Sequence, residues 1–220
     1  MRRSFWLVCA LAASAGVAVA QDSLPVAKLD PDVAAHLVRI VDSARVRGLP
    51  TDPIVAKISQ GVLFHSPPER IVVAAQNVVS RLEEARMALA PKPTPSDIAA
   101  GENALGVDGV TTTALQAVRA TSPSRSVAVP LGLLAQLVAG KVPVSRATKI
   151  VTDLIKRGAT DPQLLALGNN VNADVVHGAR AMASLDVRLQ GLNAVLAPLG
   201  AAATSADGPQ SAASGPGKKP

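Results

Sequence analysis

The chain has 220 residues, and its 22 basic residues outnumber its 16 acidic residues, which gives a formal charge of +6 at neutral pH. The basic residues are scattered among acidic ones, and the chain contains one Trp, two Phe and no Tyr. A nucleic-acid-binding face needs clustered cations and usually stacking aromatic rings, so this composition argues against a nucleic-acid partner. The single Cys excludes an internal disulfide framework.

The first twenty residues have the pattern of a secretory signal peptide. Two arginines precede an apolar run over residues 5–19, and Ala18-Val19-Ala20 places small residues just before Gln21. A signal peptidase recognises this combination, so we expect residues 1–20 to be removed and the mature chain to begin at Gln21. Removal lowers the formal charge to +4 and leaves Phe64 as the sole aromatic residue.

The leader also bears on the route of export and on membrane attachment. Cys9 lies inside the apolar run, too early for a lipidation site, and the three-residue charged region of the leader favours the general secretory route over the twin-arginine route that Arg2-Arg3 resembles. After cleavage, no segment approaches the ~18 consecutive apolar residues of a membrane helix. We expect a periplasmic or extracellular protein without a transmembrane segment.

The first helices of the mature chain are predicted from their boundary residues. Residues 21–30 are interpreted as a flexible lead-in, and a helix begins at Asp30-Pro31. That helix ends in the turn formed by residues 47–53, whose sequence is Arg-Gly-Leu-Pro-Thr-Asp-Pro. Gly suits the left-handed residue that closes a helix, Thr or Asp caps the next helix, and Pro is tolerated at a first helical position.

A longer helix is predicted to open at Pro67-Pro68, because apolar residues recur at helical spacing from Ile71 to Leu82. Phe64 stands in the turn before it, and we interpret this ring as a core anchor. These helices make up a first lobe over residues 31–90. Residues 91–95, with the sequence Pro-Lys-Pro-Thr-Pro, are predicted to be a stiff connector to a second lobe over residues 96–200.

The second lobe repeats signals of the first. Residues 157–162, with the sequence Arg-Gly-Ala-Thr-Asp-Pro, resemble the turn at residues 47–53, and Pro143 precedes an amphipathic stretch as Pro67 does. We expect Gly48 and Gly158 to be equivalent helix-ending residues. The repeating unit is a short helix, a turn that contains glycine, and a longer helix. Two weaker copies are predicted, one where Val110-Thr111-Thr112 leads to Val118 and one where Val129-Pro130 leads to Gly140. A last copy is predicted to run from Pro162 through Gly168 and Asp174 to a helix that bears Val175, Ala179, Met182, Leu189 and Leu196.

These patterns predict an all-α fold. Strand signals are weak, because the Val residues stand at helical rather than alternating positions. We expect degenerate short-helix/long-helix repeats, packed as a bundle or as a short superhelix. Residues 201–220 are mostly Ala, Ser, Gly and Pro and are predicted to be a disordered tail. Gly101 has no matched turn, so its substitution is expected to cost less than that of the two turn glycines.

Three histidines follow the leader, and none lies within one helical turn of another, so they do not form the ligand set of a zinc site. They are His36, His65 and His177. Asp32 and His36 stand four residues apart and are interpreted as a surface ion pair. We therefore predict no metal-binding residue among them.

The segment from Asn170 to Asp174 resembles the start of a calcium-binding loop, since oxygen-bearing side chains alternate along it. Val175 stands where such a loop needs glycine, and Ala181 stands where it needs an acid. We interpret the segment as a turn in which Asn172 or Asp174 caps the last helix. No metal or cofactor is expected.

No catalytic residue is assigned from the sequence. Glu83 and Glu84 are neighbours, so they diverge on a helix and are interpreted as a solvated face. Glu102 stands between a glycine and an amide, and all-α cell-wall lyases work with one Glu, but such enzymes bind sugars largely by aromatic stacking. The chain has no Gly-x-Ser-x-Gly motif and no phosphate-binding loop.

The resulting hypothesis is an exported, non-catalytic helical repeat protein with a binding or structural role in the bacterial cell envelope. Its partner is expected to be a protein or another envelope component. The main alternative is an envelope hydrolase acting on peptidoglycan, and a third is a membrane-surface protein that uses amphipathic helices. The oligomeric state and the role of the tail are left open.

Processing of the leader gives a direct prediction. We expect N-terminal sequencing and the intact mass of the exported protein to show cleavage between Ala20 and Gln21, because the small residues of the motif fit the signal peptidase. A mature protein that retains Trp6, or that is lipidated on Cys9, would contradict it.

Overall fold

The computed structural model describes residues 29–196, which form nine α-helices and no strand. The all-α prediction is confirmed for this part of the chain. The expected signal peptide, most of the expected lead-in and the expected tail lie outside the described residues. The helices are α1 (Pro31–Val46), α2 (Asp52–Leu63), α3 (Pro68–Ala88), α4 (Pro95–Leu105), α5 (Thr112–Thr121), α6 (Ala128–Ala139), α7 (Val144–Lys156), α8 (Asp161–Val176) and α9 (Ala181–Leu196).

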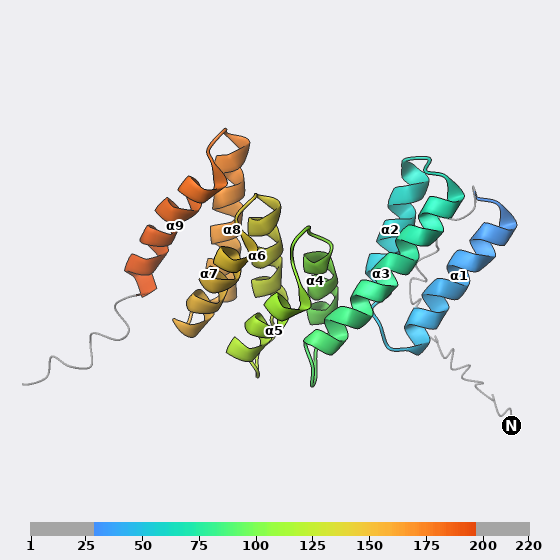
Figure 1. Ribbon diagram of the computed structural model, residues 1–220, viewed down its shortest axis with the longest axis horizontal. Helices are drawn as coiled ribbons and strands as arrows, with labels where there is room; N and C mark the ends of the chain where they lie inside the picture. Colours follow the sequence, from blue (N-terminus) through green and yellow to red (C-terminus); the bar gives the residue numbers. More distant parts are fainter. Residues whose placement is uncertain (1–28, 197–220) are drawn as a thin grey trace, which may run out of the picture.

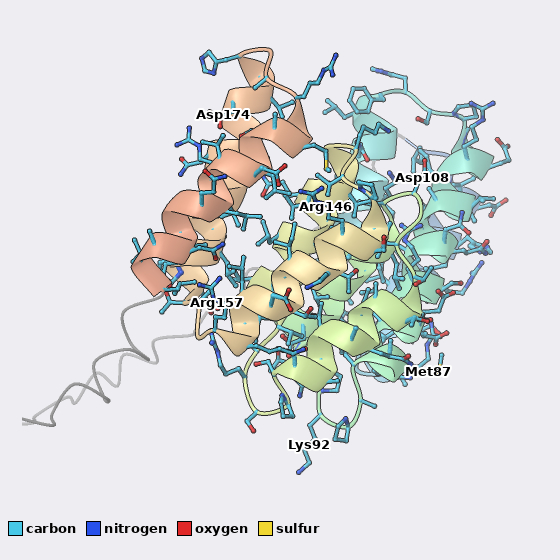
Figure 2. All side chains as sticks on the ribbon, turned by 60° about the vertical axis from the view of Figure 1, so that its left-hand side comes forward. Met87, Lys92, Asp108, Arg146, Arg157 and Asp174 are labelled. Atoms are coloured by element: carbon cyan, nitrogen blue, oxygen red, sulfur yellow. The ribbon has the colours of Figure 1, made fainter. Side chains whose placement is uncertain are left out.

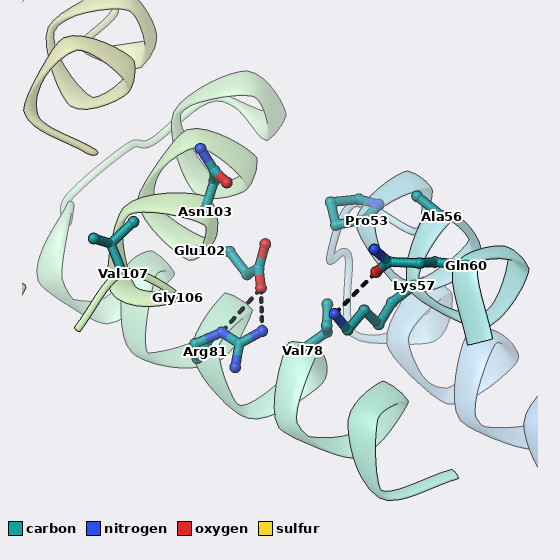
Figure 3. Close-up of a pocket in the computed structure, with 10 residues that line it drawn as sticks. All are labelled: Pro53, Ala56, Lys57, Gln60, Val78, Arg81, Glu102, Asn103, Gly106 and Val107. Carbon is teal, nitrogen blue, oxygen red and sulfur yellow. Dashed lines mark hydrogen bonds and ion pairs between the residues drawn. The ribbon is translucent and has the colours of Figure 1, made fainter. Parts of the chain in front are cut away.

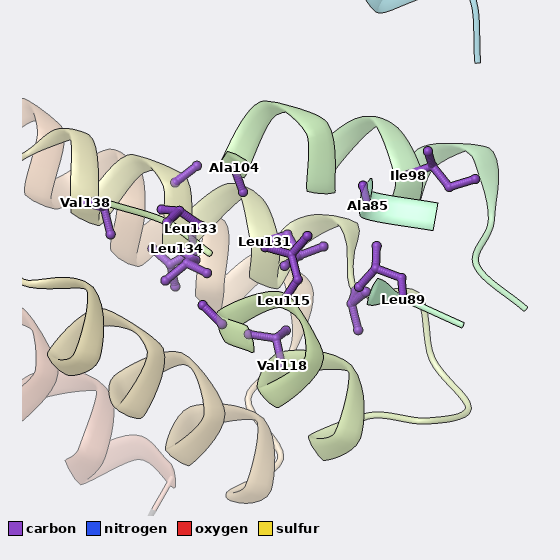
Figure 4. Packing of buried hydrophobic residues seen from close by; sticks show 14 of the residues in the cluster. Ala85, Leu89, Ile98, Ala104, Leu115, Val118, Leu131, Leu133, Leu134 and Val138 are labelled. Carbon is purple, nitrogen blue, oxygen red and sulfur yellow. The ribbon is translucent and has the colours of Figure 1, made fainter. Parts of the chain in front are cut away.

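The helices are stacked in chain order, with α1 at one end of the molecule and α9 at the other (Figure 1). One layer contains α1, α3, α5 and α7, each of which packs against the next. The other layer contains α4, α6 and α8, which pack in the same successive way. Buried aliphatic side chains fill the space between the layers (Figure 4). The molecule is therefore an extended stack rather than a closed bundle.

The matched turns predicted from the sequence have matching geometry. Gly48 and Gly158 both adopt a left-handed backbone, with φ of 70° and 79°. The N–H of each glycine donates to the carbonyl oxygen three residues earlier, and the N–H of the next residue donates to the carbonyl oxygen five residues before it. This is the Schellman pattern that closes a helix. The residues after the two glycines, Leu49 and Ala159, are buried and fix the turns against the core.

The two matched turns also make equivalent long-range contacts. Arg47 pairs with Glu83 of α3, and Arg157 donates to Asn193 of α9, each at a separation of 36 residues. Arg157 and Arg146 lie on the side of α7 that faces α9 (Figure 2), and Arg146 pairs with Asp186. The correspondence is confined to these two turns, and the repeat organisation of the chain stays a prediction.

The predicted last copy of the unit is wrong in its details. Gly168 is not in a turn but in the interior of α8, and the chain turns at Gly178, where φ is 94°. Val175 therefore belongs to α8 and Ala179 to the turn. The physical reason is a close approach, because a Cβ on Gly168 would lie 2.3 Å from Oε1 of Gln136, whose amide donates to the Gly168 carbonyl oxygen at 3.1 Å.

The proline-rich segment joins two helices that pack directly on each other. Pro95 is the first residue of α4 rather than part of the connector, and Thr94 caps that helix. Ala85 and Leu89 lie in the same buried cluster as residues of α4 and α5 (Figure 4). A Cβ on Gly101 would lie 2.9 Å from the Ala85 Cβ and 3.1 Å from Cδ1 of Leu89. The two predicted lobes thus meet in a packed interface.

Asp97 connects the start of α4 to the start of α6 from a buried position. Its Oδ1 accepts hydrogen bonds from the Ser126 hydroxyl and the Val127 N–H, both at 2.7 Å. Its Oδ2 accepts from the Thr94 N–H at 3.1 Å, which completes a capping box. Burial opposes ionisation of Asp97, but these hydrogen bonds outweigh it and lower the pKa of the carboxyl below its ordinary value.

The tight packing at Gly101 gives its substitution a cost of its own, although no turn is involved. We predict that Gly101→Ala lowers the free energy of unfolding by about 1–2 kcal/mol, because overpacking at Ala85 and Leu89 outweighs the gain in helix propensity. Gly132→Ala is the matched control, since a Cβ there meets nothing within 4 Å, and it should stabilise by up to about 1 kcal/mol. Urea unfolding followed by circular dichroism measures both. If both substitutions changed the free energy of unfolding by the same amount and in the same direction, the proposed overpacking at Gly101 would be contradicted.

Removing the buried carboxylate should be costly. We predict that Asp97→Ala lowers the free energy of unfolding by about 3 kcal/mol, because the Val127 N–H and the Ser126 hydroxyl lose their acceptor. Asp186→Ala, which removes a half-exposed carboxylate, is the control and should cost less than about 1 kcal/mol. Thermal and urea melts of the two variants give the comparison.

The same carboxylate predicts a pH dependence. Because the folded-state pKa of Asp97 is lowered, its stabilisation is complete above the ordinary value of 3.8 and is lost as the pH falls below it. The wild-type protein should therefore lose its stability advantage over Asp97→Ala on acidification below about pH 4. An advantage that stays constant from pH 6 to about pH 2 would contradict the assignment.

Candidate functional site

A groove opens between α2 and α4 on the surface of α3 (Figure 3). The direct packing of α4 on α6 and of α6 on α8 is not continued between α2 and α4. The space left between these two helices has a volume of about 490 Å³. It is lined by Pro53, Ala56, Lys57 and Gln60 of α2, Val78 and Arg81 of α3, Glu102 and Asn103 of α4, and Gly106 and Val107 after it.

A partly buried ion pair closes one wall of the groove. Oε1 of Glu102 accepts hydrogen bonds from Nε and Nη2 of Arg81, at 3.0 and 2.7 Å. The Glu102 side chain is 10% exposed and that of Arg81 is 29% exposed. Gly101 sets this geometry, because the missing side chain lets α4 approach α3 closely enough for the next residue to reach Arg81.

The second oxygen of Glu102 is the unusual group of the site. Oε2 accepts no hydrogen bond within the described part of the chain, and Figure 3 shows it pointing into the groove. This oxygen is open to the groove rather than sealed in the core, so a donor from outside the protein can reach it. The groove thus presents an acceptor that a ligand or solvent donor would satisfy.

Across the groove from the acceptor Oε2, α2 presents side chains that carry hydrogen-bond donors. Nζ of Lys57 donates to Oε1 of Gln60 at 3.0 Å, which leaves the Gln60 amide nitrogen exposed. The exposed amide of Asn103 borders the same space from α4. The groove therefore offers hydrogen-bond donors and acceptors on both walls above the apolar Val78.

Glu102, which the sequence singled out, lies in this groove, but not in an arrangement suited to acid–base catalysis. No second carboxylate and no aromatic ring is among the groove residues. A pair of carboxylates is the usual requirement for glycoside hydrolysis, and aromatic rings bind the sugars. The sequence did not predict Arg81 as its partner. The available signal was the position of Arg81 on the same face of α3 as Val78 and Ala74.

Two other predictions about charged groups need correction. Glu84 is exposed, but Glu83 is half-buried and pairs with Arg47 of the α1–α2 turn, so the two acids do not form one solvated face. Asp32 and His36 do not form the expected ion pair. The N–H of Asp32 instead binds the side chain of Asp30, which caps α1.

The segment from Asn170 to Asp174 is helical and lies inside α8, so its interpretation as a turn is wrong. Asp174 accepts hydrogen bonds from Nε and Nη2 of Arg188 and from the Ser184 hydroxyl, which join α8 to α9. These bonds lower its pKa to about 2. Within residues 29–196, no group of three or more His, Cys, Asp or Glu side chains is placed to hold a metal ion.

Phe64 is not a core anchor. It caps the end of α2 with 68% of its surface exposed, and Leu63 beside it is 71% exposed. His65 follows with a φ of 52°, so the turn adopts the left-handed conformation without a glycine. The sequence predicted the turn correctly, but not that it would project a ring into solvent.

The chain was compared with protein-family models, curated proteins and solved structures, and nothing matches it. None of the described helices combines the length and the apolar character needed to cross a membrane. The functional assignment therefore depends on the chemistry of the groove.

Proposed function

We propose that this is an exported, non-catalytic protein of the bacterial cell envelope that binds a protein or another envelope component in the groove between α2 and α4. The observation that carries the proposal is Oε2 of Glu102, an acceptor that is open to the groove and has no hydrogen-bond partner within the described residues, on a side chain that is only 10% exposed. Binding sites orient their ligands through a small number of polar groups that point into a recess, and this oxygen is such a group.

The shape of the stack supports a binding role rather than a purely structural one. Stacked helices present extended surfaces, and a break in one layer creates a recess with walls from two helices and a floor from a third. The floor helix α3 also packs against α1 and α5, and most of the groove residues belong to helices α2, α3 and α4. A site on rigid elements keeps its shape before the ligand arrives.

The leader supports the proposed compartment. Two arginines, an apolar run and the Ala18-Val19-Ala20 motif favour export. A peptidoglycan hydrolase remains the alternative, because Glu102 does face a cavity. A lone carboxylate already engaged by Arg81 makes this the less favoured reading.

Site-specific photocrosslinking tests the proposal in cells. A photoreactive amino acid in place of the exposed Asn103 should be recovered from the envelope fraction crosslinked to one defined partner. The matched control places it at Lys149, an exposed position on α7 far from the groove, and should give no such product.

Three outcomes would overturn the proposal. The protein could be retained in the cytoplasm, or the crosslinks from positions 103 and 149 could be identical. Alternatively, the purified protein could release fragments from isolated peptidoglycan, with the release abolished by Glu102→Gln. That last result would establish the hydrolase.

A further inference from the structure

The groove does not end at Lys57 and Gln60. A second hollow, of about 280 Å³, shares these two residues and continues toward the α2–α3 turn. It is lined in addition by Gly61, Phe64, Ser66, Arg70, Ile71 and Ala74. The two hollows are therefore neighbouring parts of one surface.

Helical spacing shows that this surface is continuous. On α3 the lining residues 70, 71, 74, 78 and 81 recur every three or four positions, so they share one face. On α2 the same is true of residues 53, 56, 57, 60, 61 and 64. Eleven helical steps along α3 from Arg70 to Arg81 span about 16 Å, which is the length of about five residues of extended chain.

The charge of the combined groove is positive. Lys57 and Arg70 are exposed on its walls, and the guanidinium of Arg70 makes no hydrogen bond or ion pair within residues 29–196. Arg81 is balanced by Glu102, the one acid that lines the two hollows. The groove therefore complements an acidic ligand.

The two ends of the groove differ in chemistry. At the far end, the exposed ring of Phe64 and the side chain of Ile71 line the same hollow and offer an apolar surface. At the near end, Oε2 of Glu102 and the amides of Gln60 and Asn103 can pair with backbone N–H and C=O groups. Sugars are bound largely by stacking on several aromatic rings, and this groove has one. A polypeptide is the better match, because it can use the amide, carboxylate and apolar contacts that the groove offers.

We infer that the groove binds an extended acidic segment of about five residues from a partner polypeptide. The segment donates a backbone N–H to Oε2 of Glu102, places carboxylates near Lys57 and Arg70, and rests an apolar side chain on Phe64. This inference rests on the proposed function, since it names the ligand class of the same groove.

The test uses the mature chain, residues 21–220, labelled with ¹⁵N and titrated with acetylated, amidated pentapeptides. The probe peptide has leucine at its first position, aspartate at the second and fourth positions, and alanine at the third and fifth. One comparison peptide replaces the aspartates by lysines, and another replaces the leucine by serine. We expect the acidic leucine peptide to shift amides in α2, α3 and α4 and to bind at least tenfold more tightly than the lysine peptide, and severalfold more tightly than the serine peptide.

Variants with matched charge changes sharpen the test. Lys57→Glu with Arg70→Glu should abolish the preference for the acidic peptide, whereas Arg39→Glu with Lys149→Glu, which alters net charge equally away from these hollows, should leave it intact. All four positions carry exposed side chains, and thermal midpoints of the variants verify folding. Phe64→Ser should weaken binding, with Val195→Ser, another exposed apolar residue, as its control.

The outcomes separate this inference from the proposed function. Equal binding of the acidic and basic peptides, or shifts scattered outside the groove, would overturn the acidic-segment inference even if position 103 crosslinks to an envelope partner. Conversely, selective binding of the acidic peptide would support the inference even if the protein proves not to be exported.

Discussion

The close approach of α4 to α3 at Gly101 is the contact on which the arrangement of this molecule depends. It brings the Ala85 and Leu89 side chains against the α4 backbone and joins the helices on either side of the proline-rich segment. It also places Glu102 beside Arg81. Because α4 packs on α3 and α6 rather than along α2, the groove is the space left over. Core packing and the candidate site thus have a common origin.

The parts of the fold that could be predicted from the sequence are those with local causes. The left-handed turns at Gly48 and Gly158 follow from the demands of a helix end, and they were predicted because few residues other than glycine fit that conformation. The helices that open after Pro67 and Pro143 were likewise predicted from a local restriction, since the two prolines have almost the same backbone angles.

The parts that could not be predicted depend on contacts distant in sequence. Glycine is a residue type typical of turns, yet Gly168 lies within a helix, where its missing side chain makes room for Gln136 of α6. Phe64 has the hydrophobicity of a core residue, yet the turn projects it outward. The sequence marked Glu102 as a candidate, but its partner Arg81 lies 21 residues away, and no local pattern pairs the two. The groove itself is a property of how helices stack, which no local motif encodes.

An open groove between α2 and α4 is the central claim, and disulfide trapping tests it most directly in the mature chain, which has no cysteine of its own after the predicted cleavage. Ala56→Cys with Asn103→Cys places thiols on opposite walls, and Gly140→Cys with Ala181→Cys places them where the two Cβ atoms are 3.6 Å apart. A disulfide needs Cβ atoms about 3.5–4.5 Å apart. We predict that mild oxidation crosslinks the second pair and leaves the first pair reduced. Rapid and complete crosslinking of the first pair would mean that α2 and α4 close on each other and that no groove exists.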